Sequence, residues 1–242
     1  MRIFVEENYE KMSRRAAQII AAQIVCKPDC VLGLATGSTP VGAYKCLVEQ
    51  FEKGDLSFAE VKSVNLDEYR GLAPTHEQSY RYFMQDNLFN HVDIKAQNTN
   101  VPDGQAPDAD AECARYESVI ADFGGIDLQL LGMGLNGHIG FNEPADEFVK
   151  DTHVVDLTES TINANSRFFA SMNQVPRQAL TMGIGSIMQA RAVLMVVSGE
   201  NKADIVERVF TGPVTPRVPA SILQLHPNVT LVGDKAALGK LV

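Results

Sequence analysis

Short apolar runs alternate with helical patterns along most of the chain. The runs are rich in Val, Ile and Leu, which predicts buried strands over residues 2–5, 31–35, 61–66, 126–131, 192–197 and 229–232. Between them, apolar residues recur at helical spacing, which predicts helices over residues 9–25, 41–53, 78–89 and 109–123. Strands that are apolar on both faces and separated by helices are typical of a mostly parallel sheet covered on both sides.

The chain length fits one α/β domain, which we expect to span residues 1–242. Residues 145–176 show the weakest periodicity, and we interpret them as a candidate lid over a site. Ligands of open parallel sheets bind beyond the carboxyl ends of the strands. The residues that directly follow each predicted strand are therefore the place to look for chemistry.

Composition narrows the classes of function. The formal net charge is −9 and no block of basic residues is present, which disfavours a nucleic-acid partner but is compatible with a small phosphorylated ligand. No apolar run approaches the ~20 residues of a membrane span, and the polar N-terminus lacks a signal-peptide core, so we expect a cytoplasmic protein without membrane contact. Cys26 and Cys30 form a close pair, but neither a second pair nor histidines at ligand spacing accompany them, so we expect no metal.

The first strand end with unusual chemistry is Thr36-Gly37-Ser38-Thr39-Pro40. Small residues let the backbone approach a ligand closely, and hydroxyls with free N–H groups at a helix N-terminus bind anions. The segment lacks the lysine of a nucleotide-binding P-loop. A simple turn with Thr or Ser as the helix cap is the alternative, and the sequence leaves both open.

The second strand end carries two adjacent acids, Asp67 and Glu68. Carboxylates are rarely buried without partners, so packing alone does not explain them. Their functional use would be proton transfer or metal binding, and the alternative is a solvated loop.

The third strand end is the glycine-rich segment 132–144, with the sequence GMGLNGHIGFNEP. It contains the G-x-G-x-x-G of dinucleotide-binding sites, and Asp156 lies 19 residues after Gly137, near the position of the ribose-binding acid. That motif requires a helix directly after the glycines, and Gly140 and Pro144 interrupt the segment. The motif therefore gives only weak support to a dinucleotide site.

Within this segment, His138 is surrounded by glycines and is followed five residues later by Glu143. A lone histidine is more often structural than functional. A carboxylate at this distance in a loop instead indicates an oriented acid–base group.

Two cations are candidate anion contacts. Lys202, in the sequence SGENKA, stands where a helix is expected to begin after a strand; a lysine on a solvated helix face is the alternative. Arg167 precedes two phenylalanines, and such an arginine is less freely solvated than most.

Taken together, the segments LATGSTP, NLDEY, GLNGHIGFNEP, NSRFF and SGENKA resemble the glucosamine-6-phosphate deaminases in order and spacing, over residues 3–232. The resemblance implies a Rossmann-like α/β fold, shared with ribose-5-phosphate isomerases and 6-phosphogluconolactonases. It implies conversion of glucosamine 6-phosphate and water to fructose 6-phosphate and ammonia, in amino-sugar catabolism, without metal or redox cofactor.

The resemblance also implies roles for single residues. Asp67 would move a proton from C2 to C1 of the opened sugar, and His138, oriented by Glu143 and Asn136, would open the ring. Imidazole suits this step because it titrates at pH ~6.5, whereas a carboxylate with a usual pKa of ~3.9 needs positioning and desolvation to act as a base. The residues expected to bind the substrate, most of them through its phosphate, are Thr36, Gly37, Ser38, Thr39, Glu68, Gly137, Arg167 and Lys202.

Two features depart from the common pattern of the family. Asn136 stands where many members have aspartate, which removes one charge from the relay; shorter members share it, so we expect activity to survive. Regulated members bind an N-acetylated sugar phosphate through a serine pair and basic residues soon after NEP, where this chain has Asp146, Glu147, His153 and Val155. Since like charges repel a phosphate, we expect no such activation.

Three alternatives stay open at this point. The nearest is a 6-phosphogluconolactonase or another sugar-phosphate isomerase on the same fold, and a dehydrogenase would rest on the glycine motif alone. A sugar-phosphate-binding regulator without turnover would be expected to lose Asp67 or His138, and both are present. The sequence does not decide between a monomer and a homo-oligomer.

Overall fold

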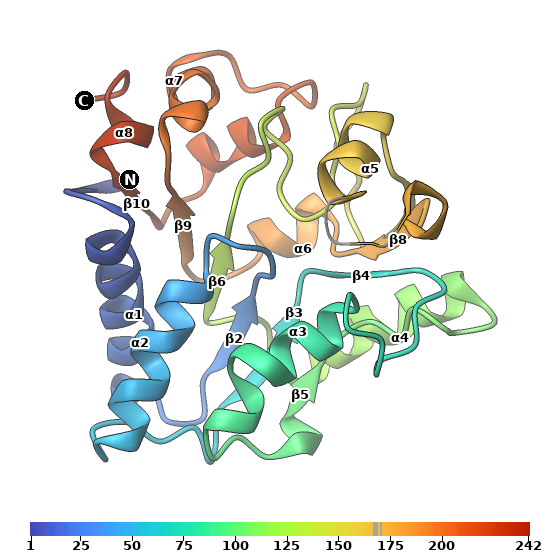
Figure 1. The fold of residues 1–242 in the computed structure, drawn as a ribbon, viewed down its shortest axis with the longest axis horizontal. Helices are drawn as coiled ribbons and strands as arrows, with labels where there is room; N and C mark the ends of the chain where they lie inside the picture. The colour runs from blue at the N-terminus through green and yellow to red at the C-terminus, as the bar shows by residue number, and fades with distance from the viewer. Residues whose placement is uncertain (167–168, 170) are drawn as a thin grey trace.

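The computed structural model describes residues 1–166, 169 and 171–242, and its centre is a seven-stranded sheet (Figure 1). The strands follow the order β1-β10-β9-β6-β2-β3-β5, and all neighbours pair in parallel. Their bounds are β1 (Arg2–Glu6), β2 (Val31–Leu34), β3 (Lys62–Asn65), β5 (Thr99–Asn100), β6 (Leu128–Leu131), β9 (Val193–Val197) and β10 (Val229–Asp234). The predicted α/β fold with a mostly parallel sheet is confirmed.

The helices begin and end where local chemistry allows. Asn8 caps the first helix by accepting the N–H of Lys11 at 3.0 Å, and the fourth ends before Gly124, which adopts a φ of 79°. The described helices are α1 (Tyr9–Cys26), α2 (Val41–Glu52), α3 (Tyr80–Asn87), α4 (Ala109–Asp122), α5 (Glu159–Asn165), α6 (Ile184–Met188), α7 (Ala203–Thr211) and α8 (Lys235–Leu238). Short 3₁₀ helices span Phe89–His91, Ala96–Asn98, Met172–Gln174, Glu200–Lys202 and Pro219–Leu225. All four helices predicted from periodicity are present as α1 to α4.

A second, antiparallel sheet was not predicted. It contains β4 (Asp67–Tyr69), β8 (Gln178–Thr181) and β7 (His153–Asp156), with β8 in the middle. The predicted strand 61–66 ends at Asn65, and the chain enters the second sheet at Asp67. The strands of this second sheet are short and mix polar with apolar residues (DEY, HVVD and QALT), so no apolar run marks them, and α5, with seven residues, is too short to show a helical period.

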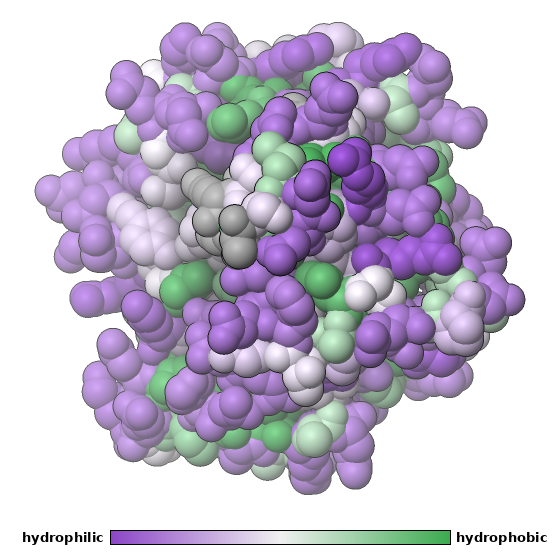
Figure 2. All heavy atoms as spheres, turned by 45° about the vertical axis from the view of Figure 1, so that its right-hand side comes forward, coloured by the Kyte–Doolittle hydropathy of each residue, from purple (hydrophilic) through white to green (hydrophobic). Residues whose placement is uncertain are grey.

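The surface is that of a protein with its apolar residues inside. On the face drawn in Figure 2 most residues are hydrophilic, and hydrophobic ones lie in small separate groups. Within the described part of the chain, no helix is both long enough and apolar enough to cross a bilayer. The core instead lies between helices and sheet, where β9 and β10 are buried along their whole length.

Candidate active site

The ends of several strands meet at a cavity of about 950 Å³. Residues that follow β2, β6 and β9 line it together with the first residue of β4, as expected for the carboxyl edge of a parallel sheet. The predicted site residues among its lining are Thr36, Gly37, Ser38, Thr39, Asp67, Asn136, His138 and Lys202. Glu68, Gly137 and Glu143 adjoin lining residues without lining the cavity themselves, and Arg167 lies outside the described residues.

The loop after β2 reaches the cavity before α2 begins. Gly37 has a φ of 90°, a backbone conformation that residues other than glycine rarely adopt. This conformation lets the chain turn at the end of β2. Pro40 occupies the cap position of α2 and makes no side-chain hydrogen bond to the helix. The alternative of a turn capped by Thr or Ser is therefore not what forms here.

Asp67 is the buried acid of the site. Asp67 is the first residue of β4, where it pairs with Thr181 of β8, and it is only 6% exposed. Burial and the neighbouring charge of Glu68 raise the pKa of Asp67 from its usual value to about 8. An acid that titrates close to neutral pH inside a cavity is suited to proton transfer.

Glu68 has a different environment. Its two carboxylate oxygens accept the backbone N–H groups of Tyr69 at 2.8 Å, Tyr80 at 2.9 Å and Arg81 at 2.9 Å, which ties β4 to the start of α3. The pKa of Glu68 is raised, because the effect of burial outweighs that of these hydrogen bonds, which act in the opposite direction. Since this carboxylate is engaged and does not line the cavity, we expect Glu68 to act on Asp67 through its charge and not on the substrate.

His138, Asn136 and Glu143 form one group. The imidazole Nδ1 lies 3.4 Å from Oε2 of Glu143, and Nδ2 of Asn136 donates to the same oxygen at 2.6 Å. A side chain at Gly134 would collide with the imidazole, since its Cβ would lie 2.3 Å from the ring. Glycine at this position lets the histidine fold back over its own loop. Among the described residues no helix follows β6 before α5, which argues against a dinucleotide site.

Glu143 also binds α5, which sequence reasoning missed. The hydroxyls of Thr161 and Thr158 donate to its Oε1, the second at 3.3 Å. Burial alone would raise the pKa of Glu143, but hydrogen bonds and charge from His138 and hydrogen bonds from Thr161 and Asn136 outweigh it and lower the pKa to about 2. The carboxylate is therefore ionised at neutral pH and can stabilise a protonated His138. The only sequence signal was the spacing of two threonines in a helix cap, T-x-x-T.

Lys202 and Gly137 hold the glycine-rich segment in place. Nζ of Lys202 donates to the carbonyl oxygen of Met133 at 2.5 Å, and burial lowers its pKa. The carbonyl of Gly137 accepts the N–H of Ala220 at 2.8 Å, away from the cavity lining. Lys202 thus reaches the cavity, whereas Gly137 anchors its wall.

An aromatic cluster next to Asp67 was also missed. The rings of Tyr69 and Tyr80 lie 4.9 Å apart, and Phe141 and Phe169 adjoin Tyr69 at 5.6 Å and 6.0 Å. All four residues line the cavity. Their apolar surface keeps water from the carboxyl group and is consistent with its raised pKa.

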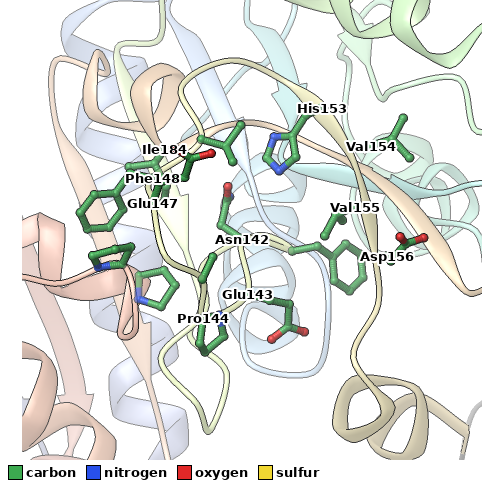
Figure 3. A pocket seen from close by; sticks show the side chains of 15 residues that line it. Asn142, Glu143, Pro144, Glu147, Phe148, His153, Val154, Val155, Asp156 and Ile184 are labelled. Carbon is green, nitrogen blue, oxygen red and sulfur yellow. The ribbon is translucent and has the colours of Figure 1, made fainter.

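A smaller cavity of about 250 Å³ adjoins the stem of Glu143 (Figure 3). The labelled side chains around it include Glu147, His153, Val155 and Asp156. In this view the carboxylate of Glu143 points away from the small cavity, consistent with its contacts to Asn136 and α5. Three of the four positions that differ from the regulated pattern, Glu147, His153 and Val155, therefore line one cavity. Among the described residues that line it, none is a lysine or arginine.

The chain is similar to known proteins along almost its whole length. A sequence profile described as Glucosamine-6-phosphate isomerases/6-phosphogluconolactonase matches residues 5–232. A glucosamine-6-phosphate deaminase of Lachnoclostridium phytofermentans is 60% identical over 232 residues, which cover 96% of this chain and 98% of that protein. One of Clostridioides difficile is 54% identical and covers 100% of this chain and 97% of its own.

Solved structures give the same result at the level of the fold. The structure of a monomeric glucosamine-6-phosphate deaminase superposes with a TM-score of 0.97 at 45% identity, over 99% of this chain and 100% of that one. A 6-phosphogluconolactonase from Leishmania guyanensis has a TM-score of 0.76 at 23% identity, over 100% of this chain and 98% of that one, a likeness in fold alone.

Proposed function

The chain belongs to the family of glucosamine-6-phosphate isomerases and 6-phosphogluconolactonases, and we propose that it converts glucosamine 6-phosphate and water to fructose 6-phosphate and ammonia. The two deaminases compared above align with it at 60% and 54% identity over nearly its full length. The observation that carries the proposal is that Asp67 and His138 line one cavity, with Glu143 behind the histidine.

His138 opens the sugar ring. It accepts the proton of the C1 hydroxyl and delivers a proton to the ring oxygen as the C1–O5 bond breaks, which leaves an aldehyde at C1. The carboxylate of Glu143, 3.4 Å from Nδ1, stabilises the imidazolium that exists between these transfers. Asn136 holds the same carboxylate oxygen, so the ring and its partner keep a fixed orientation.

Asp67 then moves a proton between carbons. Its carboxylate removes the proton from C2, the C2 electron pair forms the C1=C2 double bond, and a proton passes from the substrate ammonium to the C1 oxygen, which gives a neutral enolamine. Return of the proton to C1 forms an iminium at C2, to which water adds before ammonia leaves and the C2 ketone of fructose 6-phosphate remains. With a pKa of about 8, Asp67 is a stronger base than an ordinary carboxylate, and a cationic amine on the substrate favours its ionised form.

The phosphate binds at the opposite end of the substrate. Hydroxyl and N–H groups of the loop from Thr36 to Thr39 and the ammonium of Lys202 supply the contacts, and we keep Arg167 as a further predicted contact. Lys202 would exchange its bond to Met133 for one to the phosphate. Binding energy at this remote group holds C1 and C2 beside Asp67.

The test is product formation from glucosamine 6-phosphate by the wild type and by Asp67→Asn. We expect equimolar ammonia and fructose 6-phosphate from the wild type. The variant should lose at least about 100-fold in kcat, the low end of what a general base contributes, while still binding substrate. Equal rates for both proteins would exclude Asp67 as the base.

The same preparations should be tested for hydrolysis of 6-phosphogluconolactone. Turnover of the lactone without release of ammonia from the amino sugar would replace the deaminase proposal by the lactonase alternative. Absence of both activities in folded wild type, with substrate binding retained, would favour a sugar-phosphate-binding regulator.

A further inference from the structure

Tyr9, the first residue of α1, makes contacts with the loop that follows β2. Its hydroxyl accepts the backbone N–H of Gly42 at 2.9 Å. The same hydroxyl lies 3.1 Å from the carbonyl oxygen of Ser38 and 3.2 Å from that of Thr39. These two oxygens are the acceptors available to its single proton. Tyr9 therefore connects α1 to Ser38 and Thr39 in the loop and to Gly42 in the first turn of α2.

These contacts replace a cap that α2 lacks. The start of a helix leaves backbone N–H groups without partners inside the helix, and Pro40 at the cap position makes no side-chain hydrogen bond. Tyr9 supplies an acceptor for one of these groups from α1, which lies alongside α2 in Figure 1. A side chain at Gly42 would prevent this approach, because its Cβ would lie 2.3 Å from the Ser13 hydroxyl oxygen and 3.0 Å from the Tyr9 ring.

The tip of the loop is open to solvent. Gly37 and Ser38 are exposed, and a Cβ at Gly37 would meet no atom within 4 Å. The hydroxyl of Tyr44 binds the carbonyl of Ala35 before the loop. Among the described residues, the side-chain hydrogen bonds that reach the backbone of Ser38 and Thr39 come from Tyr9.

We propose that Tyr9 is a positioning residue that holds the loop of residues 36–42 in the conformation that binds the substrate phosphate. Tyr9 is not among the residues that line the cavity, so it acts through the loop and not on the substrate. A loop that is already ordered loses little conformational freedom on binding, and this favours affinity. The inference rests on the proposed function, because it requires that the loop bind phosphate.

The test is Tyr9→Phe, which removes the hydroxyl and keeps the ring. One hydrogen bond contributes about 1 kcal/mol, so we expect KM to rise about fivefold while kcat stays within about twofold. The inhibition constant of inorganic phosphate, measured as a competitive inhibitor, should rise by the same factor. An unchanged KM and inhibition constant, or a loss of kcat with an unchanged inhibition constant, would overturn the inference.

Two further variants make the result specific. Tyr82→Phe removes the hydroxyl of an exposed tyrosine on α3 that does not line the cavity, and it should change neither constant. Lys202→Met should raise KM if the phosphate binds where we propose. If Lys202→Met raises KM and Tyr9→Phe does not, the inference about Tyr9 alone is wrong. If Lys202→Met leaves KM unchanged and phosphate does not inhibit the wild type, the phosphate site itself is wrong, and the inference falls with it.

Discussion

Asp67 has little access to water and has a second carboxylate as its neighbour in the chain. Because burial and the charge of Glu68 raise its pKa to about 8, the base form is a minority in the free protein at neutral pH. We therefore expect kcat/KM for glucosamine 6-phosphate to increase from pH 6 to about pH 8 and then to level off. The measurement is a pH profile of kcat/KM, which reports groups of the free enzyme and free substrate.

Whether the increase of kcat/KM between pH 6 and pH 8, the acid limb of the profile, reports Asp67 can be checked with Glu68→Gln. The amide keeps an oxygen acceptor for the start of α3 but removes the charge that opposes ionisation of Asp67. The limb should move to lower pH. The titrating groups of the substrate are identical in both experiments, so a limb that does not move would have to belong to the substrate or to another side chain.

Helix α5 connects a segment of weak sequence pattern to the acid–base group. Its threonines donate to Glu143, and the hydrogen bond from Thr161 is one of the interactions that lower the pKa of that carboxyl to about 2. Thr161→Val removes the donor at nearly constant volume. Glu143 should then titrate at higher pH and orient His138 less well.

For Thr161→Val we expect kcat to fall about tenfold to 100-fold, in line with the loss of one hydrogen bond to a charged group. The fall should be the same at all pH values above about 5, because Glu143, with a pKa of about 2 in the wild type, stays ionised there and only its orientation toward His138 changes. Asn163→Ala changes an exposed residue of the same helix and serves as the control. An equal loss of kcat in both variants would indicate that α5 has only a structural role.

On the scale of the whole molecule, the small cavity beside Glu143 bears on regulation. Glu147 and Asp156 line it with His153, and Asp146 forms an ion pair with Arg217 nearby, which occupies that arginine. A phosphorylated effector would meet negative charge there. We expect the saturation curve for glucosamine 6-phosphate to be hyperbolic and unchanged by N-acetylglucosamine 6-phosphate at concentrations below those that compete at the active site. A curve that the effector sharpens or shifts to lower substrate concentration would contradict this.

The sequence determined six of the seven strands of the parallel sheet, the helices α1 to α4 and the strand ends that meet at the cavity, whereas β5 was not predicted. Strands that are apolar on both faces admit no other arrangement than a covered sheet, so β2, β6, β9 and β10 could be predicted from their residues. The topology of such a sheet brings strand ends together. For this reason Thr36, Asp67, His138 and Lys202 could be placed in one site although they are far apart in the chain.

The tertiary structure decided the residues that surround and orient this site. The periodicity of a sequence indicates that one face of a helix is buried, but not which segment covers that face. The contacts of Tyr9 with the loop after β2 and of Thr161 with Glu143 therefore had no local signal in the sequence. The antiparallel sheet places Asp67 beside β8, and its strands are too short to show alternation. The raised pKa of Asp67 arises in the same way, since burial by partners distant in sequence changes the chemistry of a side chain whose identity alone is visible in the sequence.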